Sequence, residues 1–141
     1  MAASKASTGV SADLGKLVLR VTLGVLILLH GIAKVIGGPA SVLGLVEKAG
    51  LPPSLGYLVY VGEMLAPILV IVGLWTRAAA SVIAINMVVA VYLVHSAELF
   101  TLSKTGGWAL ELQGLYFFTA VAVALLGAGR FSLGGAHGRL N

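Results

Sequence analysis

The chain contains no cysteine, which excludes disulfide bonds, CxxC redox pairs, thiolate metal sites and iron–sulfur clusters. Charged residues are also scarce, at 10% of 141 residues against about 25% in typical soluble domains. Hydrophobic residues make up 59% of the chain, and the mean hydropathy is +1.05. A water-soluble domain of this size has too much surface to cover with so few polar side chains. The composition therefore predicts an integral membrane protein of one domain.

Nucleic-acid binding is not indicated, although the net charge is +4. The nine Lys and Arg residues are spread along the chain without a basic run or an RNA-binding motif. Positive charge in a membrane protein is instead expected in the segments that stay on the cytoplasmic side.

Four apolar runs are long enough to cross a membrane, at residues 14–36, 55–74, 78–97 and 108–126. Each has roughly the 20 residues that a helix needs to span a hydrocarbon core of about 30 Å. Only helices and closed barrels satisfy the backbone in lipid, and these runs are too continuous for barrel strands. We predict an all-α, four-helix membrane bundle over residues 14–133, between a flexible polar N-terminus, 1–13, and a C-terminal tail, 134–141. The first run exceeds the apolar core of a signal peptide, so cleavage is not expected.

Basic residues predict the orientation. The N-terminus, the turn after the second run and the tail hold five of them, Lys5, Lys16, Arg77, Arg130 and Arg139. The other side holds Lys34, Lys48 and Lys104. The richer side is expected to be cytoplasmic, which places both termini inside a bacterial-type cytoplasmic (inner) membrane. Segment 39–50 is too short to span, and it is either a short interfacial helix or a plain connecting loop.

Ionisable groups within the apolar runs are candidates for function, because each costs about 2.5–3.5 kcal/mol to insert. With a helical rise of about 1.5 Å per residue, five of them fall between the outer surface and the midplane. These five are His30, Lys34, Glu63, His95 and Glu111. We expect them to share a cavity that opens toward the outer leaflet.

Glu63 lies closest to the middle of the membrane, where a carboxyl group must be protonated or paired with a cation. The possible cationic partners are Lys34, His30 and Arg20. Pro67 follows four residues later and cannot donate to the Glu63 carbonyl, which predicts a kink. Arg20 has an alternative, structural role as a side chain that reaches toward the lipid phosphates.

Two pairs of polar residues do not fit one shared face. Asn86 and His95 are nine residues apart and point to opposite sides of a straight helix, and Glu111 and Gln113 also diverge. His95 can equally be a residue of the membrane boundary. Small residues at Gly24, Gly31, Gly62, Ala66 and Gly114 indicate close helix packing.

These polar residues occur in an order that resembles the DoxX family of membrane proteins. The matching stretches are LVLRVTLGVLILLHGIAK, GLPPSLGYLVYVGEMLAPILVIVGLWTRAAA and GAGRFSL, with His95 ending the third run and a Glu opening the fourth. The positions that match are Arg20, His30, Lys34, Glu63, Arg77, His95, Glu111 and Arg130. The resemblance implies a four-helix bundle associated with membrane redox chemistry. Some relatives are subunits of a thiosulfate:quinone oxidoreductase and others take part in oxidative-stress complexes, whereas the cysteine pairs of a wider quinone-reactive group are absent here.

Three functions fit these features, and the sequence does not decide whether the chain is itself an enzyme. The first is a quinone-interacting subunit or partner of a membrane oxidoreductase. Its candidate proton relay is Glu63, His30 and Lys34, and its candidate quinone pocket is His30, Glu63, His95, Glu111 and Arg20. Apart from a quinone we expect no cofactor and no metal, so a soluble or membrane redox partner has to supply electrons.

The second function is a non-enzymatic adaptor that docks a soluble redox enzyme on the membrane. The third is a small carrier or proton pathway, which four spans would support only in a homo-oligomer. The adaptor predicts that loss of Glu63 impairs folding alone, and the carrier predicts flux across a membrane.

Overall fold

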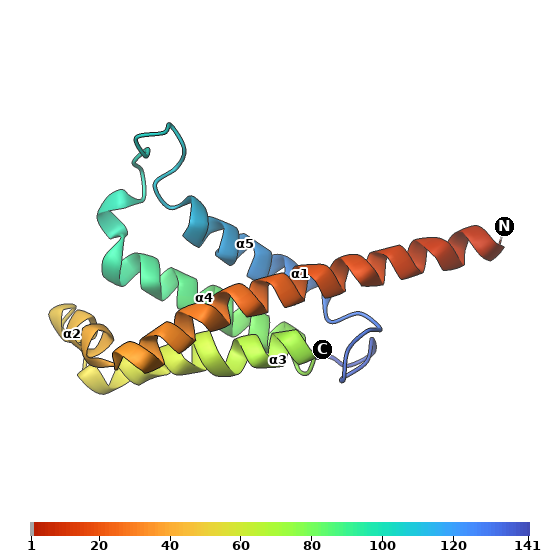
Figure 1. Cartoon of the computed structure of the whole chain (residues 1–141), viewed down its shortest axis with the longest axis horizontal. Coiled ribbons are helices and arrows are strands. Elements are labelled where there is room, and N and C mark those ends of the chain that lie inside the picture. Colours follow the sequence, from red (N-terminus) through yellow and green to blue (C-terminus); the bar gives the residue numbers. More distant parts are fainter. Residues whose placement is uncertain (1) are drawn as a thin grey trace.

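The structure is a computed structural model that describes the backbone of residues 2–141 and the side chains of residues 9–141. Its regular elements are helices (Figure 1), which confirms the predicted all-α fold. In chain order they are α1 (Ala2–Gly37), α2 (Ala40–Lys48), the 3-10 helix η1 (Pro53–Leu58), the π-helix η2 (Val61–Leu65), α3 (Ala66–Val72), α4 (Thr76–Val94), the 3-10 helix η3 (Ser96–Glu98) and α5 (Glu111–Leu126). A membrane helical bundle is compatible with this arrangement.

Within the part of the chain that the structure describes, three helical stretches are long and apolar enough to cross a membrane, Gly9–Gly37, Pro53–Val72 and Thr76–Val94. The fourth apolar helix, α5, has 16 residues, which corresponds to about 24 Å at the usual rise. It begins at Glu111 and not at Trp108, where the fourth run was predicted to start. The preceding residues form a turn instead, because the Ser103 amide donates to the Gly107 carbonyl at 2.7 Å and the Trp108 indole donates to the Leu99 carbonyl at 2.8 Å.

The N-terminal helix is longer than the sequence predicts. Helix α1 begins at Ala2 and runs through the segment that was expected to be a flexible tail. This segment has no proline, and its alanines favour a helix. Near its end Asp13 forms ion pairs with Lys16 and Arg130, both at 3.7 Å. Segment 39–50 contains the helix α2, the first of its two predicted forms.

The bundle is held together by small residues and a central apolar cluster. Helix α1 packs on α3 and α5, and α4 packs on α5. Leu23, Ile27, Val70, Ile83 and Val123 are buried where these helices meet. The predicted close packing at the small residues is seen at Gly24, where an added methyl would lie 2.5 Å from Ile71 Cγ1 and would force the two helices apart.

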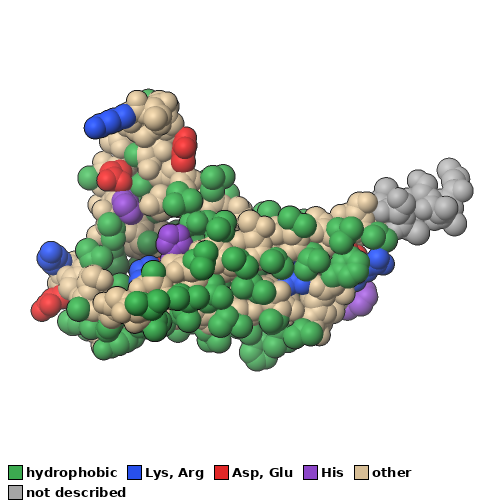
Figure 2. Space-filling model, in the orientation of Figure 1, with side chains coloured by type: hydrophobic (Ala, Val, Ile, Leu, Met, Phe, Trp, Pro, Cys, Tyr) green, Lys and Arg blue, Asp and Glu red, His purple; other side chains and the backbone are tan. Residues whose placement is uncertain are grey.

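Large apolar side chains cover the outside of the molecule (Figure 2). Ile36, Ile85, Tyr92 and Leu125 are all well exposed, whereas the buried residues are few. This distribution is unfavourable in water, because contiguous apolar surface is costly there. It is the distribution expected of helices whose solvent is hydrocarbon.

Both termini lie at one end of the bundle, while α2 and the connection between α4 and α5 lie at the other (Figure 1). The C-terminal segment is bound to the first end. The Leu133 amide donates to the Val72 carbonyl at 3.1 Å, and Thr76 Oγ1 donates to Asn141 Oδ1 at 3.0 Å. The two ends therefore differ, and the polar residues discussed below belong to the end that carries α2.

Candidate functional site

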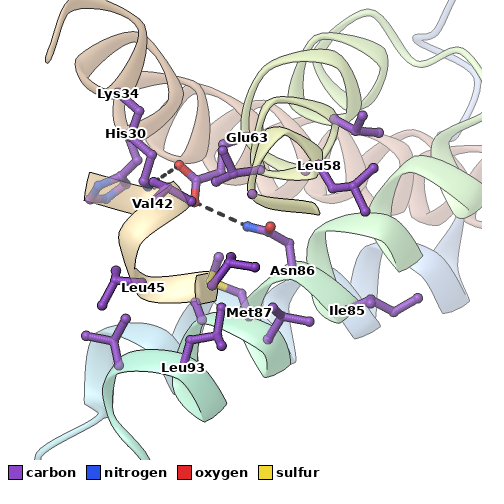
Figure 3. Close-up of a pocket in the computed structure, with 18 of the residues that line it drawn as sticks. His30, Lys34, Val42, Leu45, Leu58, Glu63, Ile85, Asn86, Met87 and Leu93 are labelled. Carbon is purple, nitrogen blue, oxygen red and sulfur yellow. Dashed lines mark hydrogen bonds and ion pairs between the residues drawn. The ribbon is translucent and has the colours of Figure 1, made fainter. Parts of the chain in front are cut away.

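A buried carboxylate with two partners forms the centre of the site. Glu63 is 4% exposed. Its Oε2 forms an ion pair with Lys34 Nζ, and its Oε1 accepts a hydrogen bond of 3.2 Å from Asn86 Nδ2 (Figure 3). The three residues come from α1, η2 and α4. A carboxylate in this position needs such partners, because an unpaired charge away from water is strongly disfavoured.

The backbone around Glu63 has the irregularity that Pro67 predicts. The Ala66 amide donates to the Val61 carbonyl five residues earlier, which defines the π-helix η2. Proline at 67 has no N–H for the Glu63 carbonyl and would clash with it in a regular α-helix. Wider turns of this kind are common at functional sites. Here the wide turn holds Glu63 between α1 and α4, each of which packs against η2.

Two glycines make room for this arrangement. A methyl group at Gly31 would clash with the Glu63 carbonyl, and one at Gly62 would lie 2.5 Å from Asn86 Cγ. No side chain fits at either position without moving the carboxylate or its amide donor. Both glycines therefore contribute to the site as well as to helix packing.

A cavity of about 650 Å³ adjoins Glu63. Its walls are mostly apolar and come from α1, α2, η1, η2, α4 and α5, with Val42, Leu45, Met87 and Leu93 among the residues that Figure 3 shows around it. Six polar residues also line it, His30, Lys34, Glu63, Asn86, His95 and Gln113. Figure 2 shows the molecule hollowed at this end, with histidine and basic side chains at the hollow. Apolar walls with a few convergent polar groups are typical of small-molecule sites, which measure about 300–1,000 Å³.

A second polar group lies at the end of the cavity near η3. His95 Nδ1 lies 2.9 Å from Glu98 Oε2, and its Nε2 lies 3.4 Å from Gln113 Nε2. The His30 ring contacts Tyr116 edge-on, with 5.8 Å between the ring centroids. The cavity thus has hydrogen-bonding groups at two places, the Glu63 end and the His95 end. Among the side chains that the structure describes, no three His, Asp or Glu residues lie close enough together to hold a metal ion.

Comparisons with known proteins agree with this picture. The DoxX family model matches residues 15–96, more than half of the chain. The chain belongs to the DoxX family. A Haemophilus influenzae relative, described only as an uncharacterized protein, is 34% identical over 118 residues, which cover 82% of this chain and 84% of the relative. A Bacillus subtilis relative named "Putative oxidoreductase CatD" is 28% identical over 118 residues, covering 84% and 83%. No solved structure gives a significant match.

Within this DoxX protein, four of the predicted site residues share the cavity. His30, Lys34, Glu63 and His95 line it, and Lys34 is the cation that pairs with Glu63. The structure therefore brings these four side chains to one cavity, while their assignment as a proton relay and quinone pocket stays a prediction.

The other two predicted pocket residues lie elsewhere. Arg20 is buried at the opposite end, where it donates to the carbonyls of Val70, Ile71 and Phe131. Of the possible cationic partners of Glu63, Arg20 is not the one that pairs with it, because carbonyls at the end of α3 and at Phe131 accept its hydrogen bonds. Glu111 is exposed and lies against Gly107 in the turn before α5. It points away because α5 presents Gln113, two residues later, to the cavity.

Asn86 and His95 were expected on opposite sides of a straight helix, and this expectation is wrong. They are nine residues apart in the sequence, yet both line the cavity. The reason is that α4 ends at Val94 and His95 has a φ of −124°, outside the helical range. The helical spacing rule therefore does not extend to His95. The glycine at 62 was the available signal, since it marks a close approach next to Glu63.

Proposed function

We propose that this DoxX protein is the quinone-handling membrane subunit of an oxidoreductase complex. The observation that carries the proposal is a buried, paired carboxylate on the wall of an apolar cavity within the membrane-spanning helices. Intramembrane ionisable groups of this kind mark ligand and proton pathways. Family membership and the oxidoreductase name of the Bacillus subtilis relative support a redox association.

The residues of the cavity fit a quinone head group. Such a group is a flat apolar ring with two carbonyl oxygens, and it needs apolar walls with hydrogen-bond donors at separate places. Asn86 and Lys34 supply donors at the Glu63 end, and Gln113 and His95 supply them at the other end. The cavity volume of about 650 Å³ lies within the usual range for small ligands.

When bound, the quinone would accept two electrons and two protons and become a quinol. We assign the electrons to a redox cofactor of the partner oxidoreductase. The chain's own residues would relay the protons one at a time: the Glu63 carboxylate would take up a proton that arrives from the aqueous end and pass it on at the cavity wall, and Lys34 would stabilise the carboxylate that remains. His30 and His95 can pass protons between the cavity and the outer end, where Glu98 is exposed.

We further propose a location in a bacterial-type cytoplasmic membrane with both termini in the cytoplasm. The end of the bundle that carries the termini includes Lys16, Arg77, Arg130 and Arg139, against Lys34, Lys48 and Lys104 toward the other end. This asymmetry is the one that sets orientation in multi-pass proteins.

The test is quinone binding by the purified protein. We expect quinone to co-purify with it and Glu63→Gln to weaken quinone binding by about tenfold or more, since the pair with Lys34 is lost and Asn86 loses a charged acceptor. Glu111→Gln is the matched control, because Glu111 is exposed and lies outside the cavity. Absence of bound quinone, or equal effects of the two substitutions, would contradict the proposal and favour a non-enzymatic adaptor.

A further inference from the structure

The cavity opens sideways between two membrane-spanning segments. Leu58 and Val61 of the Pro53–Val72 stretch line it and are exposed, and the same holds for Ile85 and Val89 of α4. A second set of exposed lining residues lies nearer the end that carries α2, among them Leu51, Val94 and Leu112. A residue that both lines a cavity and faces the outside belongs to its opening. In Figure 3, Leu58 and Ile85 lie on the side of Asn86 away from His30 and Lys34. We call the first four residues, Leu58, Val61, Ile85 and Val89, the side mouth.

From their places in the spanning stretches, the side-mouth residues are expected within the hydrocarbon and not at the membrane surface. Ile85 is the middle residue of the 19-residue helix α4. Leu58 and Val61 precede the buried Glu63 in the second spanning stretch. A lipid chain can therefore reach the mouth directly, whereas a water-soluble ligand would have to cross hydrocarbon to use it, where each unpaired polar group is strongly disfavoured.

We infer that the ligand is a long-chain amphiphile that enters from the lipid through the side mouth. Its head group lies against Glu63 and Asn86, and its chain leaves between Leu58 and Ile85 into the bilayer. The identity of the head group rests on the proposed quinone function. The presence of a hydrocarbon chain on the ligand and its route of entry rest on the side mouth alone.

The hydrocarbon chain of the ligand adds little affinity in this arrangement. Lipid tails are as apolar as the mouth residues, so moving the chain from lipid to protein gains almost nothing. The head group provides the affinity, and the mouth decides which ligands fit. Blocking the mouth should thus discriminate between ligands with and without a chain.

The experiment compares two tryptophan substitutions on α4. Ile85→Trp fills the side mouth, and Val88→Trp is the matched control, because Ile85 and Val88 are 63% and 55% exposed but only Ile85 lines the cavity. Binding of a polyprenyl quinone and of the same quinone ring without a chain is measured in nanodiscs, with concentrations expressed per lipid. We expect Ile85→Trp to weaken polyprenyl quinone binding by about tenfold and binding of the bare ring by less than about twofold. Val88→Trp should change neither.

Two results of this comparison would overturn the inference while leaving quinone binding intact. Equal weakening of both ligands would mean that Ile85 belongs to the head-group pocket, and no change in either would mean that the chain takes another route. If no variant binds any quinone, the proposed function fails.

A measurement without quinone then tests the mouth by itself. Since the chain has no cysteine, a nitroxide on Leu58→Cys reports a single site, with Leu65→Cys as a lipid-facing control outside the cavity. Both labels should be accessible to oxygen and protected from a water-soluble nickel reagent. Accessibility to the nickel reagent at position 58 but not at position 65 would show that the side mouth faces water, and this result would overturn the inference.

Discussion

At the residue scale, the pair of Lys34 and Glu63 is held together by its surroundings. Lys34 remains a third exposed, while the Glu63 side chain is 6% exposed. Loss of Lys34 would leave a buried carboxylate with Asn86 as its remaining partner. Loss of both charges together would leave a neutral amide that Asn86 can still bind.

This asymmetry predicts a non-additive double-mutant cycle. Lys34→Met should lower the free energy of unfolding by about 1–3 kcal/mol, because a buried charged acceptor loses its cation. Adding Glu63→Gln should restore most of that loss. Unfolding in mixed detergent micelles measures both effects. Simple additivity of the two substitutions would show that the ion pair contributes nothing to the fold.

Gly31 tests whether the glycines position the carboxylate. Gly31→Ala places a methyl group against the Glu63 carbonyl, whereas Gly15→Ala on the same helix meets nothing within 4 Å. We expect Gly31→Ala to destabilise the protein by about 1–3 kcal/mol and to weaken quinone binding. Gly15→Ala should be neutral or slightly stabilising, since alanine favours a helix. Equal unfolding midpoints for the two variants would exclude a tight contact at Gly31.

At the element scale, the sequence predicts the existence and the type of each helix better than the residues at which it begins and ends. Long apolar runs determine the helices because hydrocarbon leaves the backbone no alternative. The start of α5 was missed because Trp108 and Gly107 take part in a turn whose hydrogen bonds join residues that sequence patterns do not connect. The shared face of Asn86 and His95 was missed for a related reason, since the position of His95 depends on α4 ending at Val94.

Arg20 was misplaced because its acceptors are backbone carbonyls, which no residue pattern reveals. It connects α1 to the end of α3 and to Phe131 of the C-terminal segment. Gly73 ends α3 there with a φ of +73° and carries the carbonyl that accepts from Gly134. Arg20 therefore acts between elements, at the end of the bundle opposite the cavity.

Arg20→Met should release the C-terminal segment without affecting the cavity. The three carbonyls lose a charged donor, so residues 131–141 are expected to become mobile. Limited trypsin digestion should cut at Arg130 several-fold faster than in the parent protein, while quinone binding stays unchanged. Lys48→Met, a change to an exposed residue of α2, is the control for loss of a positive charge. A loss of quinone binding in Arg20→Met would show that Arg20 contributes to the quinone site and would contradict this prediction.

At the scale of the whole molecule, the two ends of the bundle differ. One end carries the termini, the bound C-terminal segment and Arg20, and the other carries α2, the turn before α5 and the cavity with its His95 and Glu98 groups. Protons that move through His95 would exchange with the aqueous phase at this second end. Under the proposed function, the orientation of the chain would thus decide on which side of the membrane protons are taken up or released.

Single cysteines can establish that orientation, because the parent chain has none. Ser103→Cys lies in the exposed turn before α5, and Ala136→Cys lies in the exposed C-terminal segment. With the basic end in the cytoplasm, a membrane-impermeant maleimide should label Ser103→Cys in intact spheroplasts and Ala136→Cys only after permeabilisation. The opposite labelling pattern would mean that the protein has the inverse orientation, with proton exchange through His95 on the cytoplasmic side. Labelling of both sites in intact spheroplasts would show that the two ends are not separated by the membrane, which is incompatible with an odd number of crossings between them.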